Sequence, residues 1–229
     1  SGTATYDIEN LAKGNEVIFD TRGLQIEKVY LGDNKEETTF RLGETDKFLG
    51  QPLIVTIKPD TRRVTIQYKT SPDAAALQWL NPQQTAGKKH PFLFTQSQAI
   101  LARTWIPIQD SPAVRITYNA KVQVPKELIA VMSAENPMQK NETGVYTFQM
   151  KQRIPSYLMA LSVGDMTFRE VGPQTGIYAE PATIEAAAYE FAEMDKMLVA
   201  AEKIYGKYRW DRYDLLVLPP SFPFGGMEN

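Results

Sequence analysis

The sequence predicts a mainly β domain followed by the beginning of an α/β domain. Through about Thr167, apolar and polar residues alternate with a period of two, which is typical of half-buried strands. Beyond Gly172-Pro173 the apolar residues recur at spacings of three and four, which is typical of an amphipathic helix. We therefore expect one domain over residues 1–170 and a second over residues 171–229.

Composition excludes several classes of function. The 229 residues, 43% of them hydrophobic, are enough for one large or two modest domains. The net charge of −2 and the absence of any Lys/Arg run longer than two argue against a nucleic-acid partner. No window approaches the ~18 apolar residues that cross a bilayer, so we expect no membrane span. The absence of cysteine excludes disulfides and fits a cytoplasmic or an exported protein equally well.

Strand signals recur along most of the first domain. The first run places Ala4, Tyr6 and Ile8 on one face at the very start, so we expect the chain to begin inside a sheet whose first strands lie outside this sequence. The longest run covers residues 114–124 and ends at Pro125. Shorter alternating runs, separated by Gly, Asn and Pro turn signals, are centred on residues 17–19, 24–26, 53–57, 64–68 and 145–150.

Three further segments complete the expected organisation. Residues 71–112 form a long, loop-rich connection, which in a compact domain is usually functional. Residues 157–164 are apolar enough to be buried on both sides. One long helix is expected from an N-cap at Thr183 to a C-cap at Gly206. Its apolar stripe, expected to face the core, consists of Ala187, Phe191, Met194, Leu198, Ala201 and Tyr205.

The last stretch, residues 213–229, reads YDLLVLPPSFPFGGMEN. It combines a short apolar strand, a turn stiffened by prolines, a Gly pair, a carboxylate and an amide. A Gly pair in extended structure allows another backbone to approach closely. A carboxylate beyond such an edge suits a charged amine, because charge-assisted hydrogen bonds are about twice as strong as neutral ones. Alone, Glu228 would be interpreted as a surface carboxylate, but Gly225-Gly226 favours a binding role.

This stretch resembles the G-x-M-E-N exopeptidase motif of the zinc aminopeptidases. Residues 77–112 and 189–229 are similar, in register and in order, to the leukotriene A4 hydrolase branch of that family. There a saddle-like N-terminal β domain of mixed and antiparallel sheets precedes a thermolysin-like α/β catalytic domain and a helical C-terminal domain. The resemblance implies that residues 1–170 are the saddle domain and residues 171–229 the truncated start of the catalytic domain.

The resemblance also implies a substrate-binding site. Gln96 and Gln98 fall where the family places residues lining the pocket for the substrate's N-terminus, and two positions apart on a strand they share a face. Glu228 is expected to bind the free amine of the substrate. Phe224 stands where this branch commonly has tyrosine, which removes a polar hydroxyl from the pocket. The exopeptidase motif itself is carried by Gly225, Gly226, Met227, Glu228 and Asn229.

Zinc is the cofactor that the resemblance implies for the intact protein. In the family, the two histidines of H-E-x-x-H and a later Glu hold the metal, and the motif's own Glu activates the water. None of these positions occurs here, and His90 is the only histidine, whereas catalytic zinc takes three protein ligands. We expect the zinc-motif Glu to lie beyond Asn229, so that these residues alone carry no catalytic group, bind no zinc and are inactive.

The sequence therefore predicts the N-terminal portion of a zinc metalloaminopeptidase, a hydrolase that removes N-terminal residues from peptides. Its expected partners are peptides with a free N-terminus and the remaining catalytic and helical domains of the same protein. The alternative is a non-catalytic, β-rich binding module that docks another chain. Continuation of the reading frame into H-E-x-x-H would distinguish the two.

Overall fold

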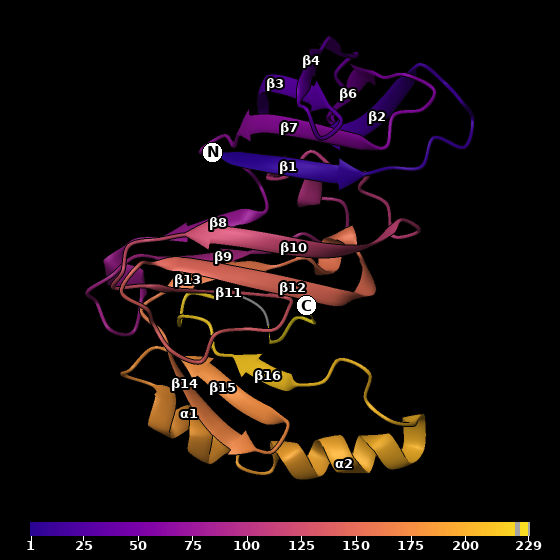
Figure 1. The fold of residues 1–229 in the computed structure, drawn as a ribbon. Helices are drawn as coiled ribbons and strands as arrows, with labels where there is room; N and C mark the ends of the chain where they lie inside the picture. The colour runs from indigo at the N-terminus through magenta and orange to yellow at the C-terminus, as the bar shows by residue number, and fades with distance from the viewer. Residues whose placement is uncertain (223–224, 229) are drawn as a thin grey trace. The chain divides into compact units, whose positions relative to one another are not determined.

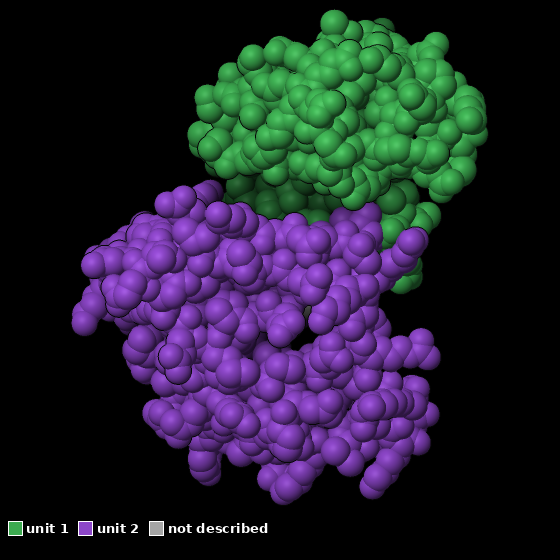
Figure 2. Space-filling view, in the orientation of Figure 1, with its two compact units in different colours: residues 1–77, 96–115, 154–159 green, residues 78–95, 116–153, 160–229 purple. Residues whose placement is uncertain are grey.

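The structure is a computed structural model and describes residues 1–222 and 225–228. Strands predominate along the chain, as predicted, and most of them pair antiparallel (Figure 1). The chain forms two compact units, coloured separately in Figure 2. The first consists of residues 1–77, 96–115 and 154–159, and the second of residues 78–95, 116–153 and 160–229. Each unit thus gathers segments that are far apart in the sequence.

The first unit contains two antiparallel sheets. One has the strand order β1-β7-β3-β4, and the other has the order β2-β6-β5. Their strands are β1 (Gly2–Asp7), β2 (Glu16–Thr21), β3 (Gln25–Leu31), β4 (Glu36–Thr38), β5 (Phe40–Leu42), β6 (Gln51–Thr56) and β7 (Arg63–Lys69). The period-two alternation gives each sheet one apolar face, and these faces supply a single hydrophobic cluster.

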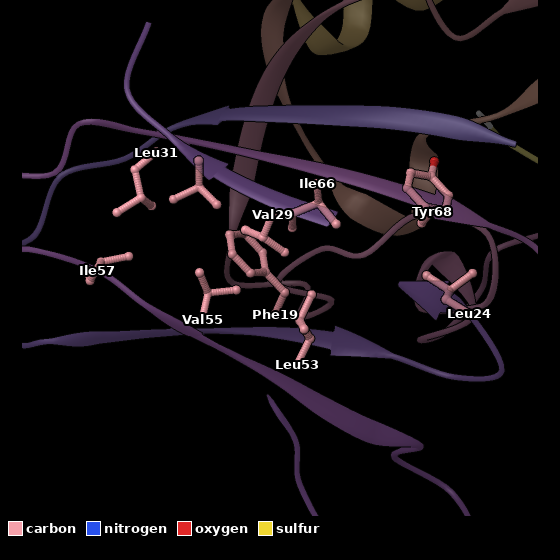
Figure 3. Packing of buried hydrophobic residues seen from close by; sticks show 10 residues of the cluster. Phe19, Leu24, Val29, Leu31, Leu53, Val55, Ile57, Ile66 and Tyr68 are labelled. Carbon is pink, nitrogen blue, oxygen red and sulfur yellow. The ribbon is translucent and has the colours of Figure 1, made fainter. Parts of the chain in front are cut away.

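The core of the first unit draws on both sheets. Phe19 and Val55 come from the β2-β6-β5 sheet, while Val29 and Ile66 come from the β1-β7-β3-β4 sheet. Figure 3 shows these side chains pointing toward one another, with Leu53 beside Phe19. All five are at most 2% exposed, so the core is closed to water.

The second unit contains the remaining sheets. One has the order β11-β13-β9-β8, β10 pairs with β12, and the third has the order β14-β15-β16, in which β15 and β16 are parallel. Their strands are β8 (Leu77–Leu80), β9 (Phe92–Thr95), β10 (Arg115–Gln123), β11 (Ile129–Met132), β12 (Val145–Pro155), β13 (Leu161–Gly164), β14 (Thr167–Gly172), β15 (Thr175–Ala179) and β16 (Tyr213–Leu216). The run at residues 157–164 is only partly buried as predicted: Ser162, Val163 and Gly164 of β13 are buried, whereas Tyr157 and Leu158 lie in a 3₁₀ turn and are partly exposed.

The single helix predicted after Thr183 is wrong, because the structure has two helices, α1 (Ile184–Glu190) and α2 (Met194–Tyr205). The chain turns between them, where the Met194 N–H donates to the Phe191 carbonyl at 3.0 Å. Residues 191–193 interrupt the helix, and beyond Met194 no residue of the predicted apolar stripe is buried.

Of the six residues in the predicted stripe, only Ala187 and Met194 are buried. Ala187 and Met194 pack with Ile177 and Ala179 of β15, and all four are buried. Tyr205, predicted as core, is 85% exposed. Gly206 does take the predicted C-cap position, with φ +87° and its N–H bonded to the Glu202 carbonyl. Figure 1 shows α1 and α2 beside the β14-β15-β16 sheet.

Gly50 is expected to be the glycine of the first unit least tolerant of substitution. Its φ is +80°, and an added Cβ would lie 2.3 Å from the Thr21 carbonyl oxygen. Left-handed backbone alone costs an L-residue about 1–2 kcal/mol, and a clash with backbone adds to it. We expect Gly50→Ala to lower the free energy of unfolding by more than about 2 kcal/mol in urea titration. Gly32→Ala is the matched control, because Gly32 has φ +65° with open space around it; equal losses in the two variants would contradict the clash.

The loop before Gly50 is expected to loosen in acid. The backbone N–H groups of Leu49 and Phe48 both donate to Asp46 Oδ1 at 2.7 Å, and these bonds lower the pKa of Asp46 below its ordinary value of 3.8. The stabilisation is therefore complete above pH 3.8 and is lost as pH falls through the folded pKa. The protection factors of the Phe48 and Leu49 amides, relative to intrinsic exchange at each pH, should fall over that range, and Asp46→Asn should remove this pH dependence. Unchanged protection at low pH would refute this account.

Candidate functional site

The segment after β9 carries the two glutamines predicted to line a pocket. The Gln96 N–H donates to the Ala76 carbonyl at 2.9 Å, which fixes the start of the segment. Gln96 is partly buried, Ser97 is buried and Gln98 is exposed. The peptide bond between Gln98 and Ala99 is cis. Both glutamine side chains therefore reach solvent on either side of an inward-facing serine.

The structure brings Gln96 and Gln98 together through a hydrogen bond. The Gln98 backbone N–H donates to Gln96 Oε1 at 2.6 Å. A backbone N–H requires an acceptor, so the oxygen of the Gln96 amide faces Gln98 and the Nε2 group keeps two N–H donors. The Gln96 side chain is therefore tied to the backbone of Gln98.

A buried ion pair, missed by the sequence analysis, holds the residues that follow. Arg103 lies in a 3₁₀ turn (Ala102–Thr104), and its Nε is 3.2 Å from Asp110 Oδ2. Arg103 also donates to the carbonyls of Asp110 and Leu49, at 2.8 and 2.7 Å. Ser156 donates to the other Asp110 oxygen at 2.6 Å. The sequence signal was an Arg and an Asp seven positions apart in an otherwise uncharged stretch.

The C-terminal stretch begins with β16, the parallel neighbour of β15. Tyr178 pairs with Leu216, and the Val217 N–H extends the ladder by donating to the Tyr178 carbonyl at 2.8 Å. Pro219 and Pro220 then lie in a turn, closed by the Phe222 N–H to the Pro219 carbonyl at 2.9 Å. The chain that follows β16 is therefore held by hydrogen bonds as far as Phe222.

The described part of the exopeptidase motif is open to solvent. Gly225 and Gly226 are exposed, and no described atom lies within 4 Å of a Cβ built at either residue. Met227 is partly buried and Glu228 is exposed. Phe224 and Asn229, also predicted for the site, lie outside the described residues. An added side chain at either glycine would therefore meet no described atom.

The two groups of predicted site residues belong to different compact units. Gln96 and Gln98 are in the first unit, while residues 225–228 are in the second. The glutamines belong to the segment of residues 96–110, which is held by hydrogen bonds within the first unit, whereas β16, which precedes the motif, pairs in parallel with β15.

The connection that enters β16 has a structural role. Arg212 donates to Asp214 at 2.9 Å, and its guanidinium lies 5.6 Å from the centre of the Phe168 ring. The hydrogen bond to Asp214 raises the pKa of Arg212. Burial and then the Asp214 carboxylate raise the pKa of Tyr178, whose hydroxyl donates to the Pro137 carbonyl. These groups fix the strand beside β15.

Glu180 is a second buried carboxylate that the sequence analysis missed. It is 4% exposed and follows β15 directly. Its two oxygens accept the backbone N–H groups of Ala86 and Gly87, each at 2.8 Å. The loop between β8 and β9 is thereby tied to the end of β15. The one available signal was an isolated Glu between an apolar run and Pro181.

The described residues do not fit a catalytic zinc ion. Within residues 1–222 and 225–228, no three His, Cys, Asp or Glu side chains gather closely enough to hold a metal. His90 is partly buried, in the loop before β9. We derive no chemical step through a metal on these residues.

Two surface hollows of the second unit lie away from the predicted site. One, of about 780 Å³, is lined by β10, β12 and residues 135–141, and the other, of about 340 Å³, lies beside α1 and β14. None of the described residues that line them belongs to the predicted site. In the described part of the chain, every helix is too short or too polar to cross a bilayer.

Comparison with known proteins establishes the family. Residues 1–158 match the Peptidase M1 N-terminal domain, so this chain belongs to the peptidase M1 family. It is 49% identical over 223 residues to leukotriene A-4 hydrolase of Xenopus laevis, over 93% of this chain and 36% of that protein. It is also 41% identical over 233 residues to leucine aminopeptidase 2 of Yarrowia lipolytica, over 100% of this chain and 35% of that protein.

Solved structures agree with this assignment. Native yeast LTA4 hydrolase superposes with a TM-score of 0.90 at 33% identity, over 99% of this chain and 36% of that one. An M1 zinc metallopeptidase from Deinococcus radiodurans, at 22% identity and a TM-score of 0.65, shares the fold. The chain thus spans about a third of the length of these curated relatives. The resemblance and the mainly β fold predicted from the sequence are confirmed, and the non-catalytic module is not favoured.

Proposed function

We propose that this chain is part of a zinc-dependent aminopeptidase that removes N-terminal residues from peptides. The observation that carries the proposal is the match of residues 1–158 to the Peptidase M1 N-terminal domain. Support comes from relatives named as leukotriene A-4 hydrolase, leucine aminopeptidase 2 and, at 49% identity over 168 residues, aminopeptidase B of Rattus norvegicus.

In this proposal, residues 1–170 are the saddle-like domain and residues 171–229 begin the catalytic domain. The remaining catalytic and helical domains of the same polypeptide are the partners of both. Zinc is the metal of the intact protein, where it would lower the pKa of a bound water and so supply hydroxide. Its ligands are assigned outside these 229 residues.

The residues of this chain are assigned to recognition of the substrate. Glu228 binds the substrate's α-ammonium group, because a carboxylate pairs with the charge that distinguishes a free N-terminus from an internal amide. The open space at Gly225 and Gly226 supports this role, since an extended peptide can approach the backbone there. Gln96 and Gln98 are assigned polar contacts to the N-terminal residue of the substrate. Met227, Phe224 and Asn229 complete the proposed set.

The experiment is an assay of the intact polypeptide with an aminoacyl-naphthylamide, together with metal analysis. We expect stoichiometric zinc and turnover that a chelator abolishes and added zinc restores. The 229-residue chain alone is the control and should show neither. Absence of turnover by the zinc-loaded intact protein, or chelator-sensitive turnover by the 229-residue chain, would overturn the proposal.

A further inference from the structure

We propose that Ser97, held by Trp105, is a positioning residue that sets the orientation of Gln96 and Gln98 toward the amino end of a peptide substrate. The inference rests on the proposed function and deepens it, because it concerns the same subsite. Ser97 does not reach the substrate itself. It acts through the two glutamines that flank it.

Ser97 is a buried residue that is held by hydrogen bonds to its side chain and to its backbone. Ser97 is 1% exposed and Trp105 is 7% exposed. Trp105 Nε1–H donates to Ser97 Oγ at 3.1 Å, and the Leu101 N–H donates to the Ser97 carbonyl at 2.8 Å. Both the side chain and the backbone of Ser97 are therefore held from the interior. A residue fixed on both sides determines the directions in which its two neighbours leave the chain.

A hydrogen bond couples the side chain of Gln96 to the backbone of Gln98. Because the Gln98 N–H donates to Gln96 Oε1, rotation of the Ser97 backbone would break or bend that bond. The Gln96 N–H is bonded to the Ala76 carbonyl, so the segment cannot adjust by sliding at its start. Movement at Ser97 would thus be passed to both amide groups rather than absorbed.

Trp105 directly follows the 3₁₀ turn (Ala102–Thr104), which is itself fixed by hydrogen bonds and an ion pair. Thr104 Oγ1 accepts the Ala76 N–H at 3.1 Å and donates to the Leu101 carbonyl at 2.7 Å. Arg103, next along the same 3₁₀ turn, is tied to Asp110. Trp105 is therefore a fixed donor, and its bond to Ser97 ties the residue between the two glutamines to this turn. A binding group needs this kind of locked support to hold its productive geometry.

The experiment uses the intact, zinc-loaded protein with Ser97→Ala, Trp105→Phe and the double variant. Each substitution deletes one polar group and keeps most of the side chain. We expect each single variant to raise KM for a free-amine tripeptide about three- to tenfold with kcat nearly unchanged. Selectivity for the free amine over the N-acetylated peptide should fall by the same factor. The double variant should be no worse than the worse single variant, because both delete one shared bond.

Thr61→Val is the matched control. It deletes another buried hydroxyl in the same unit, one that accepts the Lys58 N–H at 2.9 Å, and should lower thermal stability without changing KM. Glu228→Gln, measured in parallel, separates the two proposals. If Glu228→Gln lowers free-amine selectivity but the Ser97 and Trp105 variants do not, the positioning role is overturned alone. If Glu228→Gln leaves selectivity unchanged, the proposed amine site fails. A loss in kcat with unchanged KM, or the same KM change in Thr61→Val, would also overturn the positioning role.

Discussion

Replacing Asp110 by Ala is expected to lower the free energy of unfolding of the first unit by about 3–5 kcal/mol. The Asp110 side chain is fully buried, and that of Arg103 is 4% exposed. Without the Asp110 carboxylate, the guanidinium keeps two backbone carbonyls but only one, more distant counter-charge, Asp20 at 3.6 Å, and the Ser156 hydroxyl loses its acceptor. An unpaired charge in the interior costs far more than the pair contributed, because its hydration is not restored.

Urea unfolding followed by the fluorescence of Trp105 is the measurement, since Trp79 and Trp210 are 62% and 46% exposed. Glu193→Ala is the control. It removes the surface pair between Glu193 and Lys196, which is shorter, at 2.7 Å, yet exposed on both sides. Exposed pairs contribute about 0.2–1 kcal/mol, so that variant should unfold almost like the parent. A loss below about 1 kcal/mol for Asp110→Ala would contradict the account of the buried pair.

Glu228→Gln in the intact protein is expected to reduce kcat/KM for free-amine peptides about ten- to a few-hundredfold. The substitution keeps the size of the side chain and removes its charge, and a hydrogen bond to a charged group contributes about 1.5–3 kcal/mol. Glu228→Ala should reduce kcat/KM at least as much. Zinc content should stay unchanged, because Glu228 is proposed to bind the substrate and not the metal.

Glu142→Gln is the matched control for charge. Glu142 is an exposed acid in the loop before β12, so its neutralisation changes the net charge equally without touching the proposed site. Steady-state kinetics on one peptide series should show a loss only for the Glu228 variants. Equal losses for Glu142→Gln would mean that the overall charge of the protein, and not a local pair, attracts the substrate.

Much of the fold was predictable because strand periodicity is a local signal. The run at residues 114–124 became β10 (Arg115–Gln123), and the alternation at residues 64–68 became part of β7. β15 was missed: all five of its residues are buried, so it lacks the alternation that marks a half-buried strand. The short strands β4 and β5, of three residues each, were too brief to show a period.

The helix after Thr183 shows where local patterns mislead. Spacings of three and four continue through Phe191, but the chain turns there, and only contact with β15 determines which residues are buried. Thr183 occupies the N-cap position, yet its hydroxyl bonds to the Glu180 carbonyl and caps no helical N–H. Neither outcome could be predicted from the sequence, because both depend on residues that pack from elsewhere in the chain.

In the candidate site, too, residues with a sequence signal were predicted, whereas residues that depend on contacts made on folding were not. Gln96, Gln98 and the Gly225 to Glu228 motif were assigned through resemblance to a family. Of the groups behind the two glutamines, Ser97 and Trp105 carry no sequence signature, and Arg103 and Asp110 show only two opposite charges in an uncharged stretch, because these partnerships exist only after folding. Sequence reasoning therefore identified the groups proposed to meet the substrate and missed their supports.

The most direct test of the central claim combines Glu228→Gln with N-acetylation of the substrate. kcat/KM is measured for the intact protein and the variant on one peptide, with its N-terminus free and acetylated. Acetylation removes the charge that Glu228 is proposed to bind, so the two changes delete the same interaction. We predict a loss of about ten- to a few-hundredfold on the free peptide and less than about threefold on the acetylated one. Equal losses on both peptides, or no loss on either, would show that the substrate's amine is not recognised by Glu228.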